Sequence, residues 1–435
     1  MTEKNPGILP ASQRSFIDVR ADSHFPIQNL PYGVFHRPDT DSRVGVAIGD
    51  MILDLGVLEE RGFFASADFG VATIFRRPSL NRFLALGRKA WRETRALITR
   101  LLDANEPTLR DNAELRRAAL VPQRDVQMDL PAEIGDYTDF YSSREHATNV
   151  GTMFRGKENA LPANYLWLPI AYHGRASSVV LSGSDLRRPC GQTKRDTAAM
   201  PDFGPSHLVD FELEMGFLVG PGSKLGQPIP VEQAAEHIFG MVLVNDWSAR
   251  DIQKWEYVPL GPFTAKNFGT SISPWVVTMD ALEPFRCTGP AQDPTPLPYL
   301  RTSGPQAYDI RLEVALQAAE MERPHVICRS NYKHLYWNMC QQLAHHTITG
   351  CDVRPGDLIA SGTISGPTPD SYGSLLELAW RGEQPLELPG GRKRSFIEDG
   401  DRIVIAGWCQ GDGYRVGFGE VAGRIIPATG DLPNR

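Results

Sequence analysis

Acidic residues alternate with apolar residues in the segment 208–219. Asp210, Glu212 and Glu214 occupy every second position, and the positions between them are apolar. Because successive side chains of a strand point to opposite faces, this pattern predicts a β-strand with one apolar row and one acidic row. Like charges a few Å apart repel, and a cation would cancel that repulsion. The acidic row therefore indicates a site for a hard metal ion.

A second group of polar residues follows the apolar run at 241–244. Asp246, Arg250 and Gln253 lie at positions i, i+4 and i+7 of a helix that we predict over 247–256. One helical face could therefore present an anion, a cation and an amide together. An ordinary capped helix with a common i,i+4 pair explains the segment equally well.

The loop-like segment 136–146 contains Asp139, Tyr141 and His146. Loops held on a rigid scaffold often carry catalytic groups. His146 qualifies as a general base only if a carboxylate orients its ring and water lies within reach. Otherwise a structural histidine is the simpler interpretation.

Four carboxylates from these segments could meet at one ion: Asp139, Glu212, Glu214 and Asp246. A divalent ion would offset half of their charge, and Lys266 or Arg250 could supply the rest. Ligation by oxygen alone favours Ca²⁺, Mg²⁺ or Mn²⁺ over zinc. The alternative is that these carboxylates simply face solvent on the polar side of a sheet.

The 435 residues, 41% of them apolar, are enough for two domains. We place the boundary near Leu130, giving domains 1–130 and 131–435. In the first we predict a hairpin over 43–56 and helices over 88–103 and 108–120.

Beyond the boundary, short alternating segments predict a mainly β (α+β) fold whose sheets have one wet face. We expect strands over 208–219, 241–246, 274–278, 308–316, 357–361, 375–380, 401–408 and 414–426. We expect helices over 231–239, 247–256 and 331–346.

Charge and composition narrow the class of partner. The net charge of −7 is spread without long runs, which argues against nucleic acid or an anionic membrane surface as a partner and favours a small soluble substrate. The six cysteines show no C-x-x-C spacing, the N-terminal residues lack the charged-then-apolar pattern of a signal peptide, and no run of about 18 apolar residues occurs. We therefore expect reduced thiols and a cytoplasmic enzyme.

Several segments closely resemble the fumarylacetoacetase family. The resemblance covers nearly all of residues 131–427 and is looser before them. Its most specific stretches are 136–149, 154–160, 172–178, 212–214, 245–251, 255–262, 360–366 and 409–419. It implies a small SH3-like N-terminal barrel, a large C-terminal mixed β-sandwich roll and a homodimer. The implied activity is hydrolysis of 4-fumarylacetoacetate to fumarate and acetoacetate, the last step of tyrosine and phenylalanine catabolism.

The same resemblance assigns roles to individual residues. It implies that Ca²⁺ is bound by Asp139, Glu212, Glu214 and Asp246. It implies a neighbouring Mg²⁺ site with Lys266 and Thr270 that shares Asp246. His146 and Glu377 match the catalytic pair. The matched substrate contacts are Tyr141, Arg155, Tyr172, Gln253, Tyr257 and Thr363.

These assignments suggest a mechanism. His146 would deprotonate water while Glu377 holds its other ring nitrogen, and the metal would stabilise an enolate leaving group. Arg250, Gln253 and Lys266 could donate to the oxyanion or protonate the leaving carbon. Two alternatives remain. One is a related metal-enolate enzyme, such as another β-diketone or acylpyruvate hydrolase or an oxaloacetate decarboxylase. The other is a non-catalytic, calcium-stabilised binding module.

Overall fold

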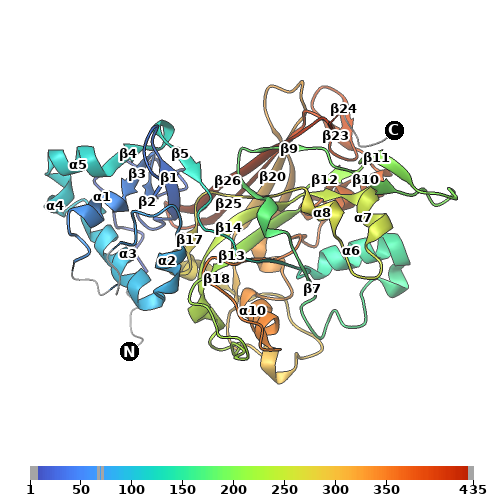
Figure 1. Cartoon of the computed structure of the whole chain (residues 1–435), viewed down its shortest axis with the longest axis horizontal. Coiled ribbons are helices and arrows are strands. Elements are labelled where there is room, and N and C mark those ends of the chain that lie inside the picture. Colours follow the sequence, from blue (N-terminus) through green and yellow to red (C-terminus); the bar gives the residue numbers. More distant parts are fainter. Residues whose placement is uncertain (1–7, 66–68, 70–72, 430–435) are drawn as a thin grey trace.

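Strands dominate the architecture, as the recurring short alternating segments predict. The computed structural model describes residues 8–65, 69 and 73–429. Figure 1 shows the N-terminal elements in blue packed beside a larger body built from the rest of the chain.

The N-terminal elements form a five-stranded antiparallel sheet in the order β4-β3-β2-β1-β5. Its strands are β1 Tyr32–His36, β2 Arg43–Ile48, β3 Met51–Asp54, β4 Leu120–Pro122 and β5 Gln127–Asp129. The predicted hairpin over 43–56 is confirmed as β2 and β3. Gly49 has a φ of 54° at the turn, in the left-handed region that glycine adopts without strain.

Five helices accompany this sheet: α1 Leu55–Glu60, α2 Asn81–Ala85, α3 Arg88–Leu102, α4 Pro107–Arg110 and α5 Ala113–Ala119. The helix predicted over 88–103 is confirmed as α3. The single helix predicted over 108–120 is wrong, because the chain forms α4 and α5 with a break between them. Asn112 starts the second helix by accepting a hydrogen bond from the backbone N–H of Leu115.

The larger body contains an eight-stranded sheet ordered β7-β6-β22-β13-β14-β16-β8, with β17 also paired to β14. Its strands are β6 Tyr137–Phe140, β7 Ala171–His173, β8 Val179–Leu181, β13 Leu213–Val219, β14 Ile238–Asp246, β16 Thr270–Ile272, β17 Val277–Thr278 and β22 Leu358–Ala360. The β22–β6 and β16–β8 pairs are parallel, and the other pairs are antiparallel. Because β13 and β14 lie in the middle of this sheet, the acidic residues that they carry lie there too.

A five-stranded sheet ordered β21-β20-β25-β26-β9 packs against it. Its strands are β9 Asp185–Arg187, β20 Arg311–Gln317, β21 His325–Asn331, β25 Arg402–Gln410 and β26 Arg415–Ile426. Leu312 and Val314 of β20 share one apolar core with Met215 and Phe217 of β13. Alternate residues of β20 are exposed or half-buried, so this sheet has the wet face that we predicted.

The strand β13 differs from that expectation, because all seven of its residues are buried. Its second face belongs to another apolar core, in which Leu218 and Val244 join Val34 and Phe83 of the N-terminal elements. This strand therefore lacks the wet face that we expected of the sheets in general. The predicted single strand over 208–219 is also divided, since β12 Val209–Asp210 ends before β13 begins.

Four short pairs of strands complete the β-structure: β10 Cys190–Thr193 with β11 Asp202–Pro205, β12 Val209–Asp210 with β15 Ser248–Ala249, β18 Arg286–Cys287 with β19 Ala307–Tyr308, and β23 Leu386–Leu388 with β24 Arg392–Arg394.

The α-helices of the larger body are short: α6 Arg144–Arg155, α7 Arg250–Glu256, α8 Thr264–Asn267, α9 Met279–Leu282, α10 Met339–Thr347 and α11 Leu375–Leu378. The strand predicted over 375–380 is wrong, because α11 lies there with Ser374 as its N-cap. The helix predicted over 231–239 is only a 3₁₀ turn, Ala234–His237, that leads into β14. No helix in the described ranges is both long and apolar enough to cross a membrane.

Candidate active site

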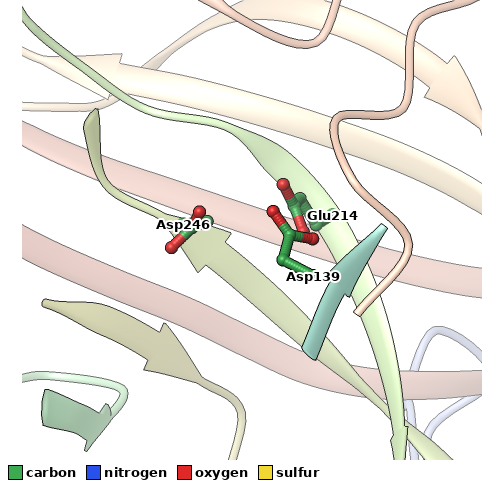
Figure 2. Close-up of side chains that lie close together, drawn as sticks. All are labelled: Asp139, Glu214 and Asp246. Carbon is green, nitrogen blue, oxygen red and sulfur yellow. The ribbon is translucent and has the colours of Figure 1, made fainter. Parts of the chain in front are cut away.

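Three carboxylates meet where β6, β13 and β14 lie within one sheet. Asp139, Glu214 and Asp246 each offer a ligand oxygen, and these oxygens lie within 4.8 Å of one another. All three side chains are buried. Figure 2 shows the carboxylates turned toward a common space, with Asp246 at the end of β14. The structure therefore brings together three of the four acidic residues predicted to bind one ion.

Glu214 provides the test of whether a metal fits. Both of its carboxylate oxygens are buried and lack a hydrogen-bond partner among the residues that the structure describes. Burial, followed by the charges of Asp139 and Asp246, raises the pKa of Glu214 well above its usual range. A buried carboxylate without any partner is costly, and a divalent cation would relieve that cost. The donor set is all oxygen, which suits Ca²⁺ or Mg²⁺.

Asp139, like Glu214, is a buried carboxylate close to other carboxylates. Burial, and next the charge of Asp246, raise the pKa of Asp139 to about 8. One of its oxygens accepts a hydrogen bond from the backbone N–H of Gly362 at 3.0 Å. The solvent-facing alternative for the acidic row is therefore wrong, because these carboxylates are buried and close together.

Glu212 lies beside the acidic cluster but already has counter-charges. Its Oε1 lies 2.6 Å from Nη1 of Arg250 and 2.9 Å from Nζ of Lys266. Its Oε2 accepts a hydrogen bond from the hydroxyl of Thr363 at 2.8 Å. Burial alone would raise the pKa of Glu212, but Lys266 and Arg250 hold it well below its usual range. Glu212 thus stays ionised without a metal, in contrast to Glu214.

Asp246 accepts hydrogen bonds from three side chains. Nζ of Lys266 lies 2.5 Å and the hydroxyl of Tyr172 2.8 Å from Oδ2, and the hydroxyl of Thr270 lies 2.7 Å from Oδ1. Burial would lower the pKa of Lys266, but Asp246 and Glu212 outweigh burial and raise it. Lys266 is therefore a charged ammonium that donates to both carboxylates.

His146 and Glu377 form a direct pair. Nδ1 of His146 lies 2.7 Å from Oε2 of Glu377, and both side chains are buried. His146 sits in the first turn of α6, where its backbone N–H donates to the N-cap hydroxyl of Ser143. The ring of Tyr141 meets the imidazole edge-on, with centroids 5.3 Å apart. The first of the two conditions set for His146, a carboxylate that orients its ring, is met.

Glu377 is held by several donors besides His146: Asn149, Ser365 and Ser374. Burial would raise the pKa of Glu377, but the charge and hydrogen bond of His146, with these donors, lower it. None of the three was predicted. Only Ser374 could have been found, because Ser374-Leu-Leu-Glu377 has the S-x-x-E pattern of a helix N-terminus.

Arg250 is fixed by two carboxylates. Its Nε donates to Oδ2 of Asp210 at 2.9 Å, and its Nη1 lies 2.6 Å from Oε1 of Glu212. Its Nη2 is buried and lacks a hydrogen-bond partner within the described part of the chain. Nη1 also reaches Oε1 of Gln253 at 3.4 Å. Nη2 of Arg250 is therefore available to donate a hydrogen bond to another group.

The predicted substrate contacts fall into two groups. The hydroxyl of Tyr172 donates a hydrogen bond to Asp246, and that of Thr363 donates to Glu212. The ring of Tyr141 packs on His146. Two others are exposed. Arg155 donates to the carbonyl oxygens of Asn159 and Ala160, and Tyr257 directly follows α7.

Comparison with known proteins covers nearly the whole chain. Residues 136–426 match the family described as Fumarylacetoacetate (FAA) hydrolase C-terminal, and residues 28–131 match Fumarylacetoacetase N-terminal. The fumarylacetoacetase of Bos taurus is 59% identical over 415 residues, covering 95% of this chain and 99% of the relative. That of Homo sapiens is 58% identical with the same coverage.

A solved structure shares the fold. The fumarylacetoacetate hydrolase from Exiguobacterium antarcticum aligns with a TM-score of 0.50 and 16% identity, covering 92% of this chain and 99% of that chain. At this identity the likeness concerns the fold alone.

Proposed function

The chain belongs to the fumarylacetoacetase family, and we propose that it hydrolyses the carbon–carbon bond of 4-fumarylacetoacetate to fumarate and acetoacetate. This reaction is the last step of tyrosine and phenylalanine catabolism. The observation that carries the proposal is the buried cluster of Asp139, Glu214 and Asp246 near the hydrogen-bonded pair of His146 and Glu377. His146 is close enough to Glu212, which adjoins the cluster, to help lower its pKa.

In this proposal His146 activates the water. Glu377 occupies Nδ1, so Nε2 remains to take a proton from water. The hydroxide oxygen attacks the ketone carbon of the fumaryl group, and Glu377 stabilises the imidazolium that forms. The bond to the acetoacetyl carbon then breaks, and that carbon receives a proton. One water is consumed, and its oxygen ends in the new carboxylate of fumarate.

Charge on the attacked oxygen needs donors, and we assign this role to Arg250, Gln253 and Lys266. The spare Nη2 of Arg250 supports the assignment, because a buried donor without a partner is free to bind substrate. Lys266 stays protonated beside Asp246 and Glu212, so it could also deliver a proton to the leaving carbon.

We assign the metal to Asp139, Glu214 and Asp246, with Glu212 as the fourth acidic residue. When bound, a divalent ion would attract the two diketone oxygens and stabilise the negative charge that develops on the departing acetoacetate. Ca²⁺ is our first choice for this position. A Mg²⁺ beside Thr270 and Lys266, sharing Asp246, stays a prediction from the family resemblance.

The substrate carries two carboxylates and a diketone. We propose that Tyr141, Tyr172 and Thr363 line the buried end of the site, because each contacts His146 or one of the acidic residues. Arg155 and Tyr257 are exposed, which suits them to bind the outer carboxylate of the substrate. Gln253, which accepts a hydrogen bond from Arg250, is the remaining contact that we propose.

The finer features of the assembly are also proposals. We propose domains at 1–130 and 131–435, an SH3-like form for the first, a homodimer and a cytoplasmic location. The alternatives, a related metal-enolate enzyme and a non-catalytic calcium module, are not favoured, because the fumarylacetoacetases named above match this chain at 58–59% identity over 95% of its length.

A direct test incubates the purified protein with 4-fumarylacetoacetate and identifies the products by mass. We expect fumarate and acetoacetate in equal amounts, with one oxygen of the fumarate taken from labelled water. An unchanged substrate, or a decarboxylated product, would overturn the proposed function.

A further inference from the structure

Asp210 belongs to the acidic row of the sequence but not to the acidic cluster. Its side chain is fully buried at the end of β12, and the three carboxylates that could share an ion do not include it. A buried aspartate needs partners, and those of Asp210 come from two separate parts of the site.

The first partner is Arg250. Nε of Arg250 donates to Oδ2 of Asp210 at 2.9 Å, while Nη1 is taken by Glu212. These two carboxylates occupy Nε and Nη1, and of the guanidinium nitrogens only Nη2 is left without a partner among the described residues. Asp210 thus helps to decide where that donor points.

The second partner is the helix that carries Glu377. The backbone N–H groups of Leu375 and Leu376 donate to Oδ1 and Oδ2 of Asp210 at 2.8 and 3.0 Å. They are the first two N–H groups of α11, which have no acceptor within the helix. Because α11 has only four residues, its placement depends strongly on such bonds. Glu377 is the third of those residues and holds His146.

We propose that Asp210 is a positioning residue that aligns the His146–Glu377 pair with the spare donor of Arg250. The Asp210 carboxylate is hydrogen-bonded both to α11, which carries Glu377, and to Arg250. Glu377 orients the base His146, and Arg250 supplies a donor for the attacked oxygen. The hydrogen bonds of the Asp210 carboxylate go to Arg250 and α11, so it acts through Arg250 and Glu377. This role rests on the proposed hydrolysis.

The test is the substitution Asp210→Asn in the full-length protein. The amide matches the carboxylate in size but has only one acceptor oxygen, so in either orientation its NH₂ group faces at least one N–H group of α11 that the carboxylate accepts. We expect kcat to fall about 10–100-fold, the effect typical of losing a group that orients a functional residue. KM and the calcium affinity should change less than about threefold.

The matched control is Asp401→Asn. Asp401 is equally buried, pairs with Arg394 through two hydrogen bonds and accepts a backbone N–H from Glu398. Among the described residues its side chain makes no hydrogen bond or ion pair with a predicted site residue. Its substitution should lower the melting temperature while kcat per folded molecule stays within about twofold of wild type.

Two double variants separate positioning from general destabilisation. In the Glu377→Gln and Arg250→Lys backgrounds, the loss caused by Asp210→Asn should be at least threefold smaller than in wild type. Full additivity in both backgrounds, or a normal kcat in Asp210→Asn, would overturn the inference. If Asp210→Asn does not fold, Asp210→Glu replaces it, since the longer carboxylate keeps the charge for Arg250 but displaces α11. A normal kcat in that variant would be equally contradictory.

The failure of this inference is distinguishable from the failure of the proposed function. A wild-type protein that does not hydrolyse 4-fumarylacetoacetate contradicts the function itself. A wild-type protein that does so, together with an equally active Asp210 variant, contradicts only the positioning role.

Discussion

Nδ1 of His146 and Oε2 of Glu377 lie 2.7 Å apart although 231 positions separate the two residues in the chain. A carboxylate at this distance selects the tautomer with the proton on Nδ1 and leaves Nε2 as the base.

Replacing His146 by alanine should lower kcat by about 10²–10⁴-fold, the range typical of a lost general base. The metal should still bind, because His146 is not one of the three clustered carboxylates. Turnover and the rise in melting temperature on adding Ca²⁺ check the two statements. The exposed His325→Ala serves as control, and near-normal turnover by His146→Ala would refute the role of His146.

Glu377→Gln keeps the size of the side chain but removes its charge. We expect kcat to fall about 10²-fold or more, because the neutral amide can present its NH₂ to His146 and no longer stabilises the imidazolium. KM should change little, since Glu377 is buried behind the imidazole. Steady-state kinetics give both values. A large rise in KM with an unchanged kcat would instead assign Glu377 to substrate binding.

Glu214→Gln should abolish metal binding and turnover together. The metal-free variant should melt at the same temperature as metal-free wild type or higher, because the amide removes the cost of keeping a buried carboxyl with a raised pKa. Calorimetric titration with Ca²⁺ and thermal melting measure these effects. Glu313→Gln, on the half-exposed face of β20, is the control. An active Glu214→Gln protein that lacks bound metal would overturn the ligand assignment.

The acidic cluster predicts how pH affects the metal-free protein. Asp139 has a pKa of about 8 in the folded chain against 3.8 for an ordinary aspartate, so between these values the folded state binds the extra proton. The free energy of unfolding of the metal-free protein must therefore fall as pH rises from about 4 to about 8. Added Ca²⁺ should remove this dependence by displacing the proton.

Melting curves at pH 5.5, 7 and 8, with chelator and with Ca²⁺, measure that effect. The increase in melting temperature caused by Ca²⁺ should grow with pH. An increase that shrinks with pH would contradict the raised pKa of Asp139 as the source of the dependence.

Arg155→Ala should raise KM about tenfold with a smaller change in kcat, as expected when a charged hydrogen bond to substrate is lost. Its neighbour Lys157, which is also exposed, gives a control substitution on the same surface. An unchanged KM in Arg155→Ala would show that Arg155 only stabilises the loop, through its hydrogen bonds to the carbonyl oxygens of Asn159 and Ala160.

Local patterns predicted much of the acidic site. Alternation along 208–219 identified a strand with Glu214 on its acidic row, because side-chain parity is a local property. Spacing alone left open whether that row faces a metal ion or solvent, and burial of the row excludes solvent. Whether the second face of β13 is wet depends on Val34 and Phe83, which lie more than a hundred positions away and close that face.

The roles within the acidic row could not be derived from spacing. Asp210 and Glu214 share one parity, yet one is paired with Arg250 and α11 while the other has no partner among the described residues. Partners distant in sequence decide this difference. In the segment 375–380 a local signal was overlooked. Ser374 and Glu377 have the spacing typical of a helix N-terminus, but the apolar residues of the segment led to the wrong prediction of a strand.

The most direct test of the central claim removes the metal and returns it. The account predicts that chelated wild-type protein stays folded but does not cleave 4-fumarylacetoacetate, and that about one Ca²⁺ or Mg²⁺ per chain restores the formation of fumarate and acetoacetate. Full turnover by protein shown to be free of divalent metal would contradict it.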